Sequence, residues 1–318
     1  MPDIDKAGHM PQFRLVTLIA LFFTAVLPAA AAPCPDQGIG VQVLGSGGTQ
    51  IGDNRASSGF LVRRDGRAIV MVNVGGGAAL RFAQSGAQIS DLKAILITNV
   101  QADSTAALPA LVQMSINKHR ESPLQVYGPG GYKTIPSTVA LIRALFEVSG
   151  GAYRELGTVL SPLQNGGFKL RPRNINIHFK DDKPLFNKNM TRTTVFDQDH
   201  LRLSAAPVDR SGVPALAWRI DIDSSSVVFA GKPMGQTDNL LHLARGAGAL
   251  VIAIPMGKGS SISPDNIGRL AHEAGVRKLI LTNLAAQASG AEKELRERIG
   301  KHYKGEIVFV EDLDCIQL

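Results

Sequence analysis

The chain has 318 residues, which is long enough for one large domain or two small ones. Hydrophobic residues make up 44% and charged residues 19%, so the composition excludes a disordered or fibrous protein and predicts a globular one with a buried core. The net charge of +7 is modest and does not by itself indicate a nucleic-acid-binding protein.

The N-terminal segment differs from the rest of the chain. Arg14 precedes an apolar run over residues 15–30, and the small residues Ala31 and Ala32 follow. A basic residue, an apolar run and small residues in this order are typical of a secretory signal. The run of about 16 residues is shorter than the roughly 20 that a membrane-spanning helix needs. We therefore expect a signal peptide over residues 1–31, no stable membrane insertion, and a periplasmic or secreted mature protein with a single domain over residues 32–318.

The two cysteines, Cys34 and Cys315, lie at opposite ends of the expected mature chain. In an oxidising compartment, their pairing would join the two ends by a disulfide. Lipid modification of Cys34 is the alternative, and Pro33 directly before it disfavours that signal. We therefore predict a Cys34–Cys315 disulfide.

The first half of the expected domain begins with strand patterns and continues with alternating strands and helices. The glycines of GSGGT, residues 45–49, permit a tight turn. Asp65-Gly66 between two β-rich runs is a strong hairpin signal. The predicted strands cover residues 41–44, 59–64, 68–74, 94–98 and 124–127, and the predicted helices cover 78–84, 106–118 and 136–148.

Residues 150–195 carry no clear pattern, and we expect an irregular insertion there. Its basic stretch, 169–192, has few aromatic residues to stack on bases, so we expect no nucleic-acid partner. The alternation of strands and helices resumes after this segment. The predicted strands cover residues 201–208, 215–222, 226–230, 249–254, 278–282 and 307–310, and the predicted helices cover 238–244, 266–274 and 291–303.

Each half therefore begins with hairpin-like strands and ends in alternating strands and helices. This order favours two sheets packed face to face, with helices outside and two similar halves. The order and its corner motifs resemble the metallo-β-lactamase fold, an αββα sandwich. Within that superfamily they resemble the ribonuclease Z and arylsulfatase-type branch, especially its exported hydrolase-like members. The motifs are LGSGGT (44–49), VNVGGG (72–77), DLKAILITN (91–99), PALAWRI (214–220), VVFAGK (227–232) and TDNLLHLARGA (237–247).

The resemblance implies two divalent ions, usually zinc, which histidines and carboxylates hold and which generate a hydroxide for hydrolysis. In this chain, the corresponding positions hold other residue types, and only Asp103 keeps its ligand chemistry. An ammonium at the metal-bridging position would repel divalent ions, and amides are poor zinc ligands, so we expect no metal cofactor. The ligand positions hold Asn99, Gln101, Asp103, Ser104, Asp209-Arg210, Lys232 and Asn283, with Ser261 at an accessory position and Asn73 in place of a supporting aspartate.

Two interpretations of Asp103 stay open. It stands just before a predicted helix, where its carboxylate or the Ser104 hydroxyl could cap the helix N-terminus. In the family fold, however, positions 103 and 232 converge on the same metals. Lys232 could therefore replace the metal charge and form an ion pair with Asp103, which Arg210 could join.

The function that we predict is non-catalytic. Asn73, Asp103, Arg210 and Lys232 would bind a small polar or anionic ligand in a pseudoenzyme, although Asp209 could offset the positive charge. A protein partner is a second possibility, and a homodimer is left open by these residues. The alternative is a hydrolase of phosphodiesterase, sulfatase or lactonase type with a metal-free or mononuclear site.

Overall fold

The computed structural model describes residues 34–49, 53–118, 120, 122–161, 167–185, 192–235, 237–254, 262–283 and 291–318. The expected signal peptide and Ser261 lie outside the described residues. No helix in these ranges is both long enough and apolar enough to cross a membrane.

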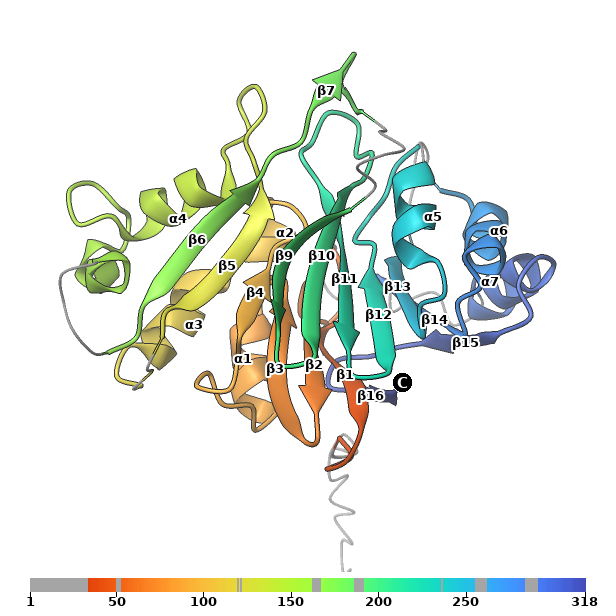
Figure 1. The fold of residues 1–318 in the computed structure, drawn as a ribbon, viewed down its shortest axis with the longest axis horizontal. Helices are drawn as coiled ribbons and strands as arrows, with labels where there is room; N and C mark the ends of the chain where they lie inside the picture. The colour runs from red at the N-terminus through yellow and green to blue at the C-terminus, as the bar shows by residue number, and fades with distance from the viewer. Residues whose placement is uncertain are drawn as a thin grey trace, which may run out of the picture. The chain divides into compact units, whose positions relative to one another are not determined.

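Two seven-stranded sheets form the centre of the domain (Figure 1). The first has the order β16-β1-β2-β3-β4-β5-β6, and its strands from β3 to β6 pair in parallel. The second has the order β15-β14-β13-β12-β11-β10-β9, and its strands from β12 to β15 pair in parallel. The first sheet comprises β1 (Ile39–Gly45), β2 (Gly59–Arg64), β3 (Arg67–Val72), β4 (Ala94–Leu96), β5 (Leu124–Pro129), β6 (Leu170–Ile175) and β16 (Cys315–Gln317). The second comprises β9 (Thr193–Gln198), β10 (Leu201–Pro207), β11 (Leu216–Ile222), β12 (Ser225–Phe229), β13 (Ala249–Ala253), β14 (Lys278–Thr282) and β15 (Glu306–Phe309).

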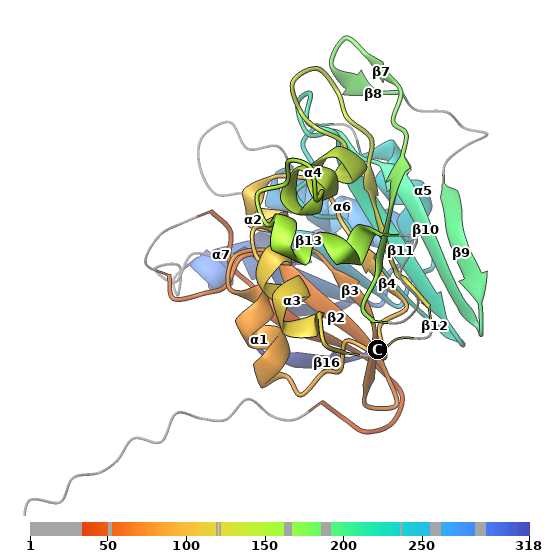
Figure 2. The ribbon, with the colours of Figure 1, turned by 90° about the vertical axis from the view of Figure 1, so that its left-hand side faces the viewer.

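Helices cover the outer faces of both sheets, which gives the predicted αββα layers. One apolar core lies between the sheets and includes Trp218 and Phe229. A second core packs α1 (Ala78–Gln84), α3 (Leu108–Ser115) and α4 (Thr138–Phe146) on the first sheet (Figure 2). A third packs α5 (Asp238–Ala244), α6 (Pro264–Ala274) and α7 (Ala291–Gly300) on the second sheet (Figure 1). Two short helices, α2 (Ala102–Thr105) and the 3-10 helix η1 (Arg154–Leu160), complete the set in the described ranges.

The prediction of an irregular insertion over residues 150–195 is wrong. This segment contains η1 and β6, a small hairpin of β7 (Phe179–Lys180) and β8 (Lys183–Pro184), and the start of β9. β6 and β9 are edge strands whose side chains are mostly exposed or half-buried, so they lack the hydrophobic alternation that signals a strand. The three-residue strand β16 was also not predicted, because it is too short to show a period.

A disulfide joins Cys34 to Cys315, as predicted, with Cα atoms 5.3 Å apart. Cys315 begins β16, where it lies opposite Gln42 of β1. The bond therefore ties the N-terminal end of the described chain to the edge of the first sheet.

Replacing both cysteines by serine should lower the free energy of unfolding by about 2 to 4 kcal/mol, because the unfolded chain regains the freedom that the long closed loop removes. Urea unfolding of the mature protein measures the change. Reductant should shift the wild-type midpoint to that of the variant and leave the variant unchanged. Equal midpoints for oxidised wild type and variant would contradict a stabilising bond.

Tyr303 makes the stability of the fold depend on pH in the alkaline range. Its side chain is 4% exposed and its hydroxyl donates to the carbonyl oxygen of Val276 at 3.3 Å. Burial, and secondly the charge of Glu306, raise the pKa of Tyr303 to about 12. The neutral phenol is therefore favoured in the folded state.

Stability should consequently fall between pH 10 and pH 12, since the unfolded phenol ionises near its ordinary pKa of about 10 while the folded one stays protonated. The loss at the upper end should be about 2 to 3 kcal/mol and should be absent below pH 10. Chemical unfolding across this range measures it. Tyr303→Phe should remove this part of the pH dependence, whereas Tyr153→Phe, at a 42% exposed position, should keep it.

Candidate functional site

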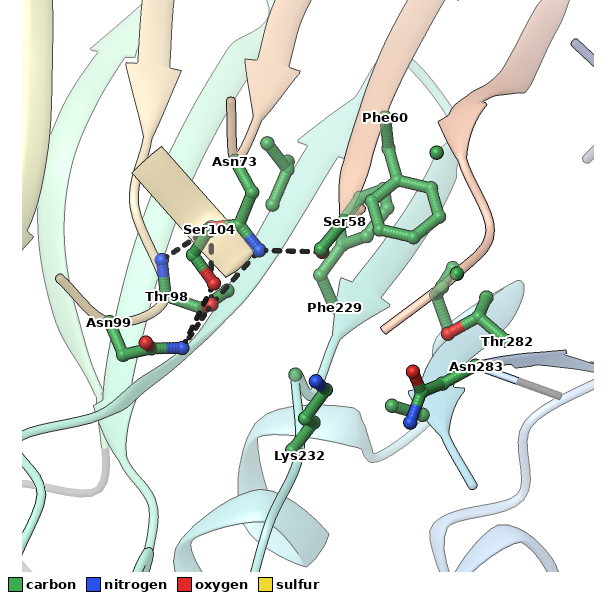
Figure 3. Close-up of a pocket in the computed structure, with 16 residues that line it drawn as sticks. Ser58, Phe60, Asn73, Thr98, Asn99, Ser104, Phe229, Lys232, Thr282 and Asn283 are labelled. Carbon is green, nitrogen blue, oxygen red and sulfur yellow. Dashed lines mark hydrogen bonds between the residues drawn. The ribbon is translucent and has the colours of Figure 1, made fainter. Parts of the chain in front are cut away.

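A pocket opens between the two sheets at the carboxyl ends of parallel strands, where open α/β sheets commonly bind ligands (Figure 3). Thr98 and Asn99 follow β4, Lys232 follows β12 and Asn283 follows β14, and all four line the pocket. Its volume is about 450 Å³, counting the space open to solvent. The fold thus brings loops from both halves of the chain to one place.

Asn73 organises one wall of the pocket from the end of β3. Its backbone has a φ of 59°, a left-handed conformation that asparagine tolerates better than most residues. Its Oδ1 accepts the backbone N–H of Thr98 at 2.8 Å, and its Nδ2 donates to Ser58 Oγ at 2.9 Å and Thr98 Oγ1 at 3.0 Å. Asn73 is only 2% exposed, so these bonds fix the corner between β2, β3 and β4.

Asn99 makes a similar set of bonds in the next loop. Its Oδ1 accepts the backbone N–H of Gln101 at 3.0 Å, and its Nδ2 donates to Ser104 Oγ at 3.1 Å and Thr98 Oγ1 at 3.3 Å. Asn99 and Ser104 are 3% and 2% exposed. Figure 3 shows this network as one continuous wall beside the pocket.

Lys232 and Asp103 form an ion pair beside the pocket. Lys232 Nζ lies 2.6 Å from Asp103 Oδ2, and the two side chains are 21% and 5% exposed. Asp103 Oδ1 is buried and accepts no hydrogen bond from the described part of the chain. The predicted pair is confirmed, and the capping interpretation is wrong, because α2 begins after Gln101 and has no side-chain cap.

Arg210 lies next to this pair but turns away from the pocket. Its guanidinium donates through Nε and Nη2 to Gln101 Oε1, and through Nη1 to the carbonyl oxygen of Lys232 at 3.2 Å. Burial lowers the pKa of Arg210, and the negative charge of Asp103 opposes that shift. On the same turn, Asp209 Oδ1 accepts the backbone N–H of Ser211 at 3.0 Å. Arg210 therefore links the three loops that carry residues 101, 210 and 232.

Asn283 forms the opposite wall. It has a left-handed φ of 66°, and its Nδ2 donates to the carbonyl oxygen of Ile254 at 3.2 Å. Its backbone N–H donates to the carbonyl oxygen of Ser46 at 2.7 Å. A Cβ atom at Gly48 would overlap the Asn283 amide, so a side chain here would displace that amide from its present position.

These residues do not fit the zinc centre that the resemblance implies. The carboxylate of Asp103, which is the only one in residues 97–107 after β4, is already paired with the ammonium of Lys232. The side-chain nitrogens of Asn73 and Asn99 are hydrogen-bond donors, and such groups cannot coordinate a cation. In the described ranges, no three His, Cys, Asp or Glu side chains are grouped to hold a metal.

The structure divides the predicted site residues into two groups. Asn73, Asn99, Ser104, Lys232 and Asn283 line the pocket, whereas Gln101, Asp103 and Arg210 are not among its lining residues and bond to one another or to Lys232 instead. Sequence reasoning missed several lining residues. One signal was available, since ILITN (95–99) and LILTN (279–283) end two strands with the same Thr-Asn pair. The missed residues include Ser58, Phe60, Thr98, Phe229 and Thr282.

No protein-family model matches the sequence. The chain is 26% identical over 303 residues to ribonuclease Z of Mycolicibacterium gilvum, covering 88% of this chain and 96% of that protein. Its fold is similar to the short form of human tRNase Z, with a TM-score of 0.64, 17% identity and coverage of 87% and 98%. It is also similar to the metallo-β-lactamase fold protein YhfI of Bacillus subtilis, with a TM-score of 0.61, 17% identity and coverage of 88% and 100%.

The sequence similarity and the arrangement of two sheets with outer helices both indicate the metallo-β-lactamase fold. The predicted fold class is confirmed. The chain has the metallo-β-lactamase fold and is similar in sequence to a ribonuclease Z over most of its length.

Proposed function

We propose that this protein binds a small polar ligand in the pocket between its sheets and does not catalyse hydrolysis. The observation that carries the proposal is the Lys232–Asp103 pair at 2.6 Å. The ion pair holds the ammonium of Lys232 at a position where the superfamily resemblance implies a metal ion. The pocket beside the pair still has room for a ligand. A metal-bound hydroxide cannot form around an ammonium and amide donors.

The position of Asp103 favours binding over metal-free hydrolysis. A general base has to reach the proton that it removes, directly or through one water. Asp103 does not line the pocket, one of its oxygens is paired with Lys232, and the other is buried. The side chains that do line the pocket are amides, hydroxyls, one ammonium and apolar groups.

We also propose that the protein acts outside the cytoplasm. The Cys34–Cys315 disulfide supports this location, because such bonds persist in oxidising compartments. Fractionation of cells expressing the full chain, with N-terminal sequencing of the mature product, tests it. A cytoplasmic product that retains residues 1–31 would contradict the proposal.

Metal analysis combined with activity assays tests the proposed function. The mature protein, purified from zinc-supplemented medium, should contain far less than one zinc per chain and show no thermal shift on zinc addition. It should not hydrolyse bis(p-nitrophenyl) phosphate, p-nitrophenyl sulfate or a simple lactone above the buffer rate. Stoichiometric zinc together with turnover that a chelator abolishes would overturn the proposal. Turnover that resists the chelator would instead establish the metal-free hydrolase.

A further inference from the structure

We propose that the ligand of this pocket is a small organic anion, with a carboxylate or phosphate-type head and an apolar body. The inference rests on the proposed ligand-binding function and specifies the ligand's chemistry. It follows from the direction of the hydrogen bonds in the pocket wall. These directions are fixed by backbone groups and therefore do not depend on the ligand.

Backbone N–H groups set the orientation of both wall amides. An amide oxygen and nitrogen are distinguished by their hydrogen-bond partners. The backbone N–H of Thr98 can only donate, so the Asn73 atom at 2.8 Å from it has to be the oxygen. The backbone N–H of Gln101 fixes Asn99 in the same way at 3.0 Å. The two Nδ2 groups consequently point to the neighbouring serines.

This orientation makes Ser58 and Ser104 donors toward the pocket. Ser58 Oγ accepts from Asn73 Nδ2 at 2.9 Å, and Ser104 Oγ accepts from Asn99 Nδ2 at 3.1 Å. Within the described ranges, neither hydroxyl hydrogen has an acceptor. Both residues line the pocket, so their hydrogens are available to a ligand oxygen. A carboxylate at position 73 would reverse this, because Ser58 would then donate to it.

Lys232 adds a positive charge to the same set of donors. One of its three N–H groups is used by Asp103, and the other two have no acceptor among the described residues. No acidic side chain lines the pocket. The two remaining N–H groups of the ammonium and the two hydroxyl hydrogens suit the oxygens of an anion, since the Asp103 carboxylate that pairs with the ammonium does not itself line the pocket.

The rest of the pocket suits an apolar body rather than a bare inorganic ion. Phe60 of β2 and Phe229 of β12 line it, with ring centroids 5.4 Å apart, and Val72 and Val251 lie beside them; each is at most 5% exposed, so the apolar contact that they offer is narrow. These four residues belong to strands, whereas the donors Ser58 and Lys232 lie on loops and Ser104 lies in α2. The ligand's charged head would thus face Lys232, and its body would contact the rings (Figure 3).

A series of nearly isosteric probes tests the charge requirement on the mature protein. Benzoate, benzamide and benzamidine share a phenyl ring and differ in head-group charge, and phenylphosphonate distinguishes a phosphate-type head from a carboxylate. Calorimetry or NMR titration should show benzoate or phenylphosphonate binding about tenfold or more tightly than benzamide, with benzamidine weakest. The tighter of the two anions identifies the head group.

Two substitutions test the hydrogen-bond argument itself. Asn73→Asp should reduce anion affinity about tenfold or more and raise benzamidine affinity, because it adds a negative charge and redirects the Ser58 hydroxyl. Ser58→Ala should weaken benzoate binding about threefold to tenfold and benzamide binding less, because a hydrogen bond to a charged oxygen is stronger than one to an amide oxygen. The matched control is Ser57→Ala, whose hydroxyl already donates to the carbonyl oxygen of Gly48 and does not line the pocket. Circular dichroism confirms that each variant is folded.

The outcomes separate this inference from the proposed function. Preferential binding of benzamide or benzamidine would overturn the anion inference and leave a polar-ligand pocket in place. Anion binding that Asn73→Asp does not change would likewise overturn it. If no probe binds at millimolar concentration, both the inference and the proposed small-ligand pocket fall. Turnover of an anionic ester would overturn the proposed function alone.

Discussion

Replacing Lys232 with methionine should lower the free energy of unfolding by about 3 kcal/mol. The substitution leaves the Asp103 carboxylate, 5% exposed, without the ammonium at 2.6 Å that now neutralises it. Breaking a buried pair from one side is strongly destabilising, because the remaining charge cannot return to water. Lys232 itself is 21% exposed, so partial solvation places the expected loss at the lower end of the range for fully buried pairs. Urea unfolding measures it.

The matched control is Lys278→Met. Lys278 has the same 21% exposure and pairs with Glu306 at 3.2 Å, but Glu306 is 60% exposed. Its loss should be below about 1 kcal/mol, as for surface ion pairs. A second comparison adds Asp103→Asn to Lys232→Met, which removes the uncompensated charge. The double variant should be more stable than Lys232→Met alone. Equal losses for Lys232→Met and Lys278→Met would contradict a structural role for the buried pair.

Zinc binding should be gained by a chain that carries Asn99→His, Gln101→His, Ser104→His, Lys232→Asp and Asn283→His together. Four of these positions line one pocket, so the new ligands would converge on it. Lys232→Asp is expected to matter most, because it replaces the ammonium beside Asp103 with a second carboxylate. Imidazole and carboxylate groups are suitable zinc ligands, whereas the native amides are not.

The variant should retain at least one zinc per chain after dialysis, measured by elemental analysis. At zinc concentrations about 100 times its dissociation constant, zinc should stabilise it by about 2.7 kcal/mol. The control keeps Lys232 and carries the other four substitutions, and it should bind zinc much more weakly. A folded five-site variant that retains no zinc would contradict the assignment of these positions to the superfamily's ligand set.

The candidate site was predictable from the sequence in its chemistry but not in its geometry. The family resemblance indicated which positions would hold metal ligands, the sequence has amides and an ammonium there, and the resemblance implied that Asn99, Lys232 and Asn283 come together at one pocket. The orientation of Arg210 was not predictable. It depends on Gln101, which lies 109 residues away in the chain and whose Oε1 accepts a hydrogen bond from the Arg210 guanidinium. This bond holds the Arg210 side chain away from the pocket.

The sequence by itself determined the fold class, because helices buried on one face leave a hydrophobic period, as α1 and α5 show, and strands buried on both faces leave a short apolar run, as β14 shows. It also determined the disulfide, because the chain offers only one pair of cysteines. Only the tertiary structure decided that Asp103 bonds Lys232 instead of capping α2, and that Ser58 and Ser104 offer their hydrogens to the pocket. The physical reason is that groups distant in the sequence decide the direction of a hydrogen bond and the partner of a charged side chain. The local sequence around each residue does not contain this information.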